Sequence, residues 1–109
     1  MKKRIKAKSK GLRREREARK IAESEGYYVC PSKGSLGPFD FSAIAKEFDI
    51  EPQVFCAEVK CNRISGKERK ELQDFQITVE KQLWLKRDYK PWIRITWNEW
   101  MNKWAPIER

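Results

Sequence analysis

The first twenty residues of this 109-residue chain carry all of its net charge. Residues 1–20 hold eleven Lys and Arg against two Glu, a net charge of +9, whereas the remaining residues hold fourteen bases and fourteen acids. Any hydrophobic core must therefore come from the neutral body that follows, and 109 residues suffice for one such core and not for two. A block of like charge that stands apart from the body is typical of a solvated segment that seeks a polyanion.

Nucleic acid is the polyanion that this segment favours, because it has too few apolar residues to anchor in a membrane surface. A tail that only keeps the protein soluble is the alternative. The chain has no apolar run near the ~20 residues of a membrane span, and its start is too polar for a signal peptide. Three cysteines, an odd number, favour a reducing compartment, so we expect an intracellular protein, in the cytoplasm or, if viral, the host cytoplasm.

The absence of histidine narrows the chemistry that the chain can perform. It excludes His-based acid–base catalysis, Ser-His or Cys-His nucleophiles and any zinc site that uses His, and three cysteines cannot form a four-cysteine site. An enzyme built from this sequence must therefore use carboxylates, Lys, Tyr or a hard cation.

The pattern of apolar and turn-forming residues predicts two helices and five strands in one domain. We expect a flexible basic arm over residues 1–8 and a single domain over residues 9–109 that ends in a Trp-rich segment. The expected helices cover residues 9–25 and 67–79, the expected strands cover 27–30, 39–45, 54–61, 82–87 and 92–97, and a helical turn is expected at 98–104. This order fits an α/β fold in which a mixed central sheet of about five strands is flanked by helices.

An acidic residue interrupts the apolar face of the first expected helix. Glu15 projects within about 40° of the centre of a stripe formed by Leu12, Ala18, Ile21 and Ala22, whereas Glu17 points away from it. A carboxylate on a core-facing stripe is unfavourable unless it is paired or binds a cation. A buried salt bridge and a metal site both remain open as explanations.

Charged residues also occupy one face of the strand 54–61. Glu58 and Lys60 are two residues apart and so lie on the same face, about 6.6 Å apart along the strand. A hairpin with the preceding strand would bring Asp40 close to Glu58, and two adjacent carboxylates repel each other unless a cation neutralises them. Oxygen ligands without histidine indicate a hard ion such as Mg²⁺, for which Mn²⁺ can substitute.

Asp40 followed by Glu58-Val59-Lys60 resembles the core of the PD-(D/E)xK nuclease superfamily. The opening Lys10-Gly11-Leu12-Arg13-Arg14-Glu15-Arg16-Glu17, and the later Gly26-Tyr27-Tyr28-Val29 and Ser35-Leu36-Gly37-Pro38-Phe39-Asp40, resemble the archaeal-type Holliday junction resolvases. The resemblance covers roughly residues 8–97. Two features depart from it, the long basic lead-in before Lys8 and the Trp-rich end after Trp97.

The resemblance implies a restriction-endonuclease-like core and a metal-dependent endonuclease of DNA. Asp40 and Glu58 would hold the divalent ion, Glu15 would complete the site, and the Val59 carbonyl would be a further ligand. Lys60 would lie beside the attacking water, protonated because two carboxylates adjoin it. The residues expected to contact DNA are basic or near the phosphate, namely Lys2, Lys3, Arg4, Lys6, Lys8, Lys10, Arg13, Arg14, Lys33 and Ser35.

The Trp-rich end suggests a second copy of the chain as a partner. Trp97, Trp100, Met101 and Trp104 would share one face of a helix, and one small domain has little core left to cover that face. A homodimer would also place two active sites to cut two strands.

We therefore expect a Mg²⁺-dependent, structure-selective endonuclease that resolves four-way DNA junctions by phosphodiester hydrolysis, without a small-molecule substrate. A restriction-like, nicking or repair nuclease of the same fold is the first alternative. A nucleic-acid-binding module without catalysis, in which the acidic residues are structural, is the second.

Overall fold

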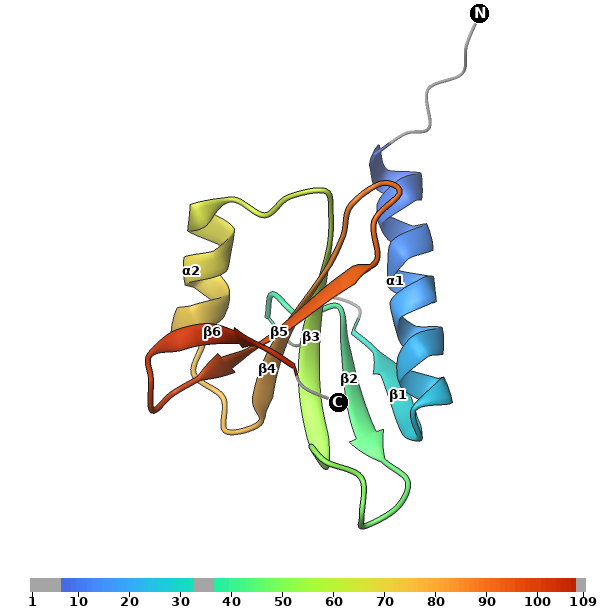
Figure 1. The fold of residues 1–109 in the computed structure, drawn as a ribbon, viewed down its shortest axis with the longest axis vertical. Helices are drawn as coiled ribbons and strands as arrows, with labels where there is room; N and C mark the ends of the chain where they lie inside the picture. The colour runs from blue at the N-terminus through green and yellow to red at the C-terminus, as the bar shows by residue number, and fades with distance from the viewer. Residues whose placement is uncertain (1–6, 33–36, 108–109) are drawn as a thin grey trace, which may run out of the picture.

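The computed structural model describes residues 7–32 and 37–107 as two helices and six strands. In chain order they are α1 (Ala7–Ser24), β1 (Tyr27–Pro31), β2 (Phe41–Ala45), β3 (Val54–Cys61), α2 (Gly66–Asp74), β4 (Glu80–Lys86), β5 (Trp92–Asn98) and β6 (Lys103–Pro106) (Figure 1). Neither helix in these ranges is long and apolar enough to cross a membrane.

The six strands form one mixed sheet in which sequence order and spatial order coincide. All neighbouring pairs are antiparallel except β3 and β4, which are parallel and are joined by the crossover through α2. The prediction of an α/β fold with a mixed sheet flanked by helices is thus confirmed, with six strands in place of about five.

The face of the sheet that α1 covers holds the larger hydrophobic cluster. Ala18 and Ala22 of α1 are fully buried there against Phe55, Ala57 and other core residues, because small side chains let the helix approach the strands closely. Ala57 and Val59 of β3 both pack into this cluster. The Phe41 ring packs edge to face against Trp84. The central carbon of the Arg94 guanidinium lies 3.8 Å from the centre of the Trp84 ring.

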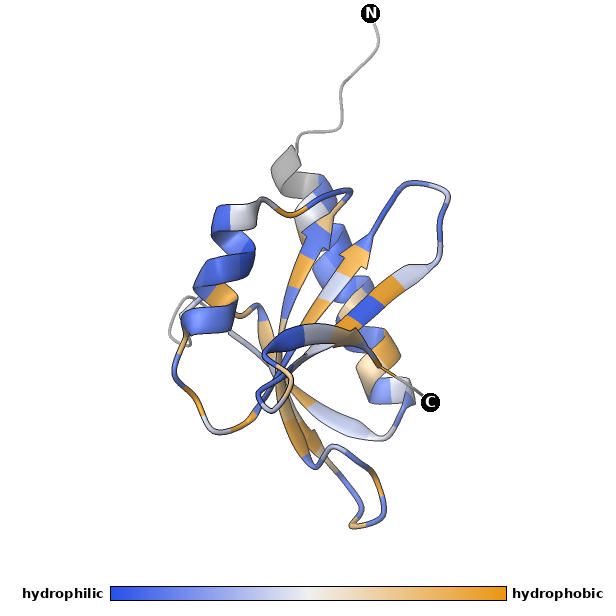
Figure 2. Ribbon diagram, turned by 60° about the vertical axis from the view of Figure 1, so that its left-hand side comes forward, coloured by the Kyte–Doolittle hydropathy of each residue, from blue (hydrophilic) through white to orange (hydrophobic). Residues whose placement is uncertain are grey.

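A second, smaller cluster lies between the sheet and α2. Leu72 is the one buried residue of α2, and it packs with Phe39, Cys56 and Leu83. The remaining surface of α2 is hydrophilic, whereas the strands carry most of the hydrophobic residues (Figure 2). Because side chains alternate along a strand, Cys56 on this face places Glu58 and Lys60 on the α2 side of β3.

The expected bounds of both helices need correction. Helix α1 begins at Ala7 and not at residue 9, so Lys8 is part of the helix and not of a flexible arm. Helix α2 ends at Asp74, not at Val79, because Phe75 turns to an extended conformation and packs against Phe39. The Lys81 ammonium of β4 donates to the carbonyls of Gln73 (2.6 Å) and Phe75 (3.2 Å), and so satisfies acceptors at this helix end.

The expected helical turn over residues 98–104 is wrong, because this segment is a β-hairpin. Trp97 of β5 pairs with Trp104 of β6, and their rings meet edge to face at 5.5 Å. The turn between them leaves Trp100 almost fully exposed and Met101 exposed at 59%. The four residues therefore do not form one apolar helix face, and that argument for a dimer no longer holds.

Candidate metal and nuclease site

Main-chain hydrogen bonds place Asp40 opposite Glu58 at the start of β2. The Asp40 N–H donates to the Ala57 carbonyl at 2.8 Å, and the Asp40 carbonyl accepts from Ser32 N–H at 2.8 Å. The Asp40 Oδ2 atom accepts a third hydrogen bond from the Val59 N–H at 2.7 Å. Pairing of Phe41 with Ala57 then sets Asp40 beside Glu58, as the sequence predicted for these two strands.

Glu15, Asp40 and Glu58 form what we call the carboxyl array. The Asp40 carboxyl lies within hydrogen-bonding reach of both Glu15 of α1 and Glu58 of β3. Glu15 thus reaches the site from the helix, as expected from its place on the core-facing side. A buried salt bridge was the other explanation for an acidic residue at this position. Glu15 instead lies beside the Asp40 carboxyl, although the positive charge of Arg19 acts to lower the pKa of Glu15.

Burial and mutual repulsion make the array bind protons more tightly than isolated carboxyls do. Burial, together with the hydrogen bond and the charge of Glu58, raises the pKa of Asp40 from 3.8 to about 7. Burial, with the hydrogen bond and the charge of Asp40, likewise raises the pKa of Glu15 from 4.5 to about 7. Burial also raises the pKa of Glu58, but the Asp40 hydrogen bond and the Lys60 charge oppose it.

Lys60 lies on the same face of β3 as Glu58 and forms an ion pair with Glu68 of α2. Burial acts to lower the pKa of the Lys60 ammonium, but the Glu68 hydrogen bond and the charges of Glu58 and Asp40 outweigh it, so this pKa lies above its usual value. Lys60 is therefore a fixed positive charge next to the carboxyl array.

The chemistry of these donors fits a hard divalent cation. Among the described residues, no three His, Cys, Asp or Glu side chains already surround a common point. The carboxyl array instead brings carboxyl oxygens close together, and oxygen is the ligand that Mg²⁺ and Mn²⁺ prefer. The backbone of Val59 runs between Glu58 and Lys60, and its N–H is committed to Asp40.

The structure ties two of the expected DNA-contacting residues to the β4–β5 turn. Lys10 Nζ lies 2.7 Å from Asp88, and Arg14 pairs with Glu17 at 3.0 Å and more distantly with Asp88 at 3.6 Å. Arg13 is exposed. The other candidates cannot be placed: Lys2, Lys3, Arg4, Lys6, Lys33 and Ser35 lie outside the described residues, as does the side chain of Lys8.

Sequence reasoning missed Glu68, the partner of Lys60. Ser65 and Glu68 form a capping box at the start of α2, in which each side chain satisfies the other residue's backbone N–H. The Ser-x-x-Glu spacing is visible in the sequence and predicts such a cap. Nothing in that spacing shows that the same carboxylate reaches Lys60.

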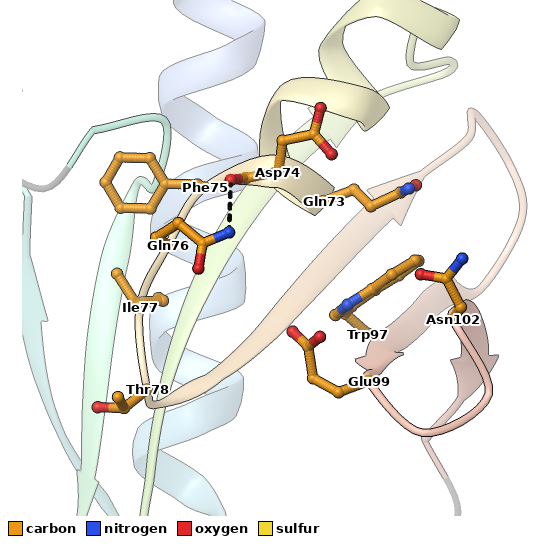
Figure 3. Close-up of a pocket in the computed structure, with 9 residues that line it drawn as sticks. All are labelled: Gln73, Asp74, Phe75, Gln76, Ile77, Thr78, Trp97, Glu99 and Asn102. Carbon is orange, nitrogen blue, oxygen red and sulfur yellow. Dashed lines mark hydrogen bonds between the residues drawn. The ribbon is translucent and has the colours of Figure 1, made fainter.

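A cavity of about 590 Å³ lies on another part of the molecule, between the segment after α2 and the β5–β6 hairpin (Figure 3). Gln76, Trp97 and Glu99 are among the residues that line it, and Gln76 Nε2 donates to the Asp74 carbonyl at 3.5 Å. No member of the carboxyl array contributes to this cavity, so it is separate from the candidate site.

Comparison with known proteins supports the fold. A scan of protein-family models and a search of curated proteins gave no match. Among solved structures, the chain is similar to Hjc, a Holliday junction resolvase from the archaeal hyperthermophile Archaeoglobus fulgidus, with a TM-score of 0.60. The two are 24% identical, and the match covers 79% of this chain and 71% of Hjc. The expected restriction-endonuclease-like core is therefore confirmed, as is the resemblance to archaeal-type resolvases at the level of the fold.

Proposed function

We propose that this protein is a Mg²⁺-dependent endonuclease that resolves four-way DNA junctions by phosphodiester hydrolysis. The observation that carries the proposal is the carboxyl array, held next to the protonated Lys60 on the fold of a Holliday junction resolvase. Clusters of carboxyls with strongly raised pKa values are unfavourable for folding and concentrate at functional sites.

Asp40, Glu58 and Glu15 are the proposed ligands of the divalent ion, with the Val59 carbonyl as a further ligand. The ion would compete with protons for these carboxyls, because their pKa values are raised. When bound, Mg²⁺ polarises the phosphoryl oxygen, lowers the pKa of water and offsets charge on the leaving oxygen. Mn²⁺ has the same preference for oxygen ligands and is expected to substitute.

Lys60 has an electrostatic role in this proposal. Because its pKa is raised, it stays protonated at neutral pH and cannot accept a proton from water. An ammonium next to the array can instead orient the attacking water by hydrogen bonding and stabilise the negative charge that develops on the phosphate.

DNA binding would depend on the basic residues of the first twenty positions together with Lys33 and Ser35. Their attraction for phosphate does not depend on base sequence, as expected for a protein that recognises the shape of a junction. We propose a homodimer, because resolving a junction requires cuts in two strands. The exposed Trp100 and Met101 of the β5–β6 turn are available as apolar contacts.

The proposal is tested by cleavage of a labelled four-way junction beside linear duplex and single-stranded DNA, each with Mg²⁺, with Mn²⁺ and with EDTA. We expect the junction to be cut in either metal and not in EDTA, and light scattering to give the mass of a dimer. Equal rates on junction and linear duplex would instead indicate a restriction-like or repair nuclease. Binding without cleavage in either metal would indicate a non-catalytic module and refute the proposal.

A further inference from the structure

The two carboxylate oxygens of Glu68 have separate partners. Oε1 accepts from the Ser65 hydroxyl at 3.1 Å and from the Ser65 N–H at 3.4 Å, whereas Oε2 contacts the Lys60 ammonium. The Ser65 hydroxyl in turn accepts from the Glu68 N–H at 3.1 Å. The capping box therefore fixes the Glu68 side chain in the orientation that points its second oxygen back toward β3.

The connector that carries this capping box is itself anchored to the sheet. Only Asn62, Arg63 and Ile64 separate β3 from Ser65. Asn62 has a positive φ of 64°, its N–H donates to the Lys86 carbonyl at 2.8 Å, and its side-chain oxygen accepts from the Asp88 N–H at 3.0 Å. The start of α2 is thus held at a fixed place relative to Lys60.

Lys60 needs such a restraint if it is to act at a defined point. A lysine side chain has four rotatable bonds, so ordering it costs conformational entropy. The Lys60 side chain is 28% exposed and that of Glu68 is 42% exposed, so packing alone does not immobilise either one. The contact between them is what fixes the ammonium above the face of β3 that bears Glu58.

We propose that Glu68 is a positioning residue, which acts through Lys60 to hold its ammonium beside the carboxyl array for DNA cleavage. The inference rests on the proposed function and extends it to a residue on α2. It assigns the Ser65–Glu68 box a second role besides capping the helix.

Glu68→Gln separates the two roles, because Gln also forms capping boxes but cannot form the ion pair. Glu71→Gln is the matched control, since it makes the same change at an exposed position of the same helix. We expect Glu68→Gln to lower kcat for junction cleavage about tenfold, in the range found for partners that orient catalytic groups, with KM unchanged. We also expect faster motion of the Lys60 ¹³Cε group by NMR relaxation in the metal-free protein. Glu71→Gln should change neither quantity.

An unchanged kcat and an unchanged Lys60 relaxation in Glu68→Gln would overturn the proposal. A higher kcat would overturn it as well, because Glu68 would then withhold Lys60 from the reaction. If the wild-type protein cleaves no DNA, the proposed function fails instead. The Lys60 relaxation data would still show whether Glu68 orders that side chain.

Discussion

Replacing Asp40 by Asn should make the metal-free protein more stable at alkaline pH. Asn keeps an oxygen that accepts from the Val59 N–H and has a shape close to that of the protonated acid. It removes the charge that burial and Glu58 oppose. The substitution thus tests whether the charge of the carboxyl array destabilises the folded protein when no cation is bound.

The sign and size follow from the pKa of Asp40, which folding raises from 3.8 to about 7. Between these values the unfolded chain loses its proton while the folded protein keeps it, so the free energy of unfolding falls as pH rises. Full linkage would give about 4 kcal/mol above pH 7 at 1.36 kcal/mol per unit. Because Asp40 is only partly buried, solvent screening reduces the expected gain for Asp40→Asn to about 1–2 kcal/mol.

Urea unfolding in EDTA, followed by tryptophan fluorescence from pH 4 to 8.5, measures this difference. We expect the wild type and Asp40→Asn to coincide near pH 4 and the variant to be more stable at pH 8. Asp49→Asn, at an exposed turn position between β2 and β3, is the control and should track the wild type. A variant no more stable than the wild type at pH 8 would refute the reasoning.

Three further predictions concern metal and DNA binding. Because protons compete with the ion at the carboxyl array, Mg²⁺ affinity should rise from pH 5.5 to 8 with release of protons, as measured by calorimetry in buffers of different ionisation enthalpy. Deleting residues 1–6 should weaken junction binding and reduce the slope of log affinity against log salt by up to about 3.6, leaving the rate of bound enzyme unchanged. Asp88→Asn should free Lys10, remove one of the two acidic partners of Arg14 and tighten junction binding about two- to fivefold in a filter-binding assay; weaker binding would contradict their expected role.

The sequence predicted best where a strand pattern and a chemical pattern coincide. The bounds of β3, the common face of Glu58 and Lys60 and the approach of Asp40 all follow from the alternation of side chains and one hairpin. The inward projection of Glu15 follows from helical periodicity in the same way.

The C-terminal segment was mispredicted because its spacing fits two structures. Trp97 and Trp104 are seven residues apart, which is two turns of a helix, but it is also the separation of a pair that faces across a short hairpin. Two asparagines favour the hairpin over the helix. Asn102 adopts a φ of 53°, and the Asn98 side chain accepts from the Met101 N–H at 3.0 Å. These turn-forming contacts outweigh a helical pattern of apolar residues.

The early end of α2 and the role of Glu68 depend on contacts between distant elements. Lys81 of β4 satisfies the carbonyls of Gln73 and Phe75, and Glu68 reaches back to Lys60 of β3. Local sequence carries no information on which strand will lie beside a helix end, so neither contact could be predicted.

The most direct test of the central claim is the single-turnover rate of junction cleavage by Glu58→Gln in Mg²⁺, at protein concentrations that saturate the junction. The substitution removes one carboxylate of the carboxyl array but keeps the side-chain shape. The account predicts that the rate falls at least about a hundredfold while junction affinity is retained, with Asp49→Asn as the control. Cleavage by Glu58→Gln at the wild-type rate would contradict the assignment of the site.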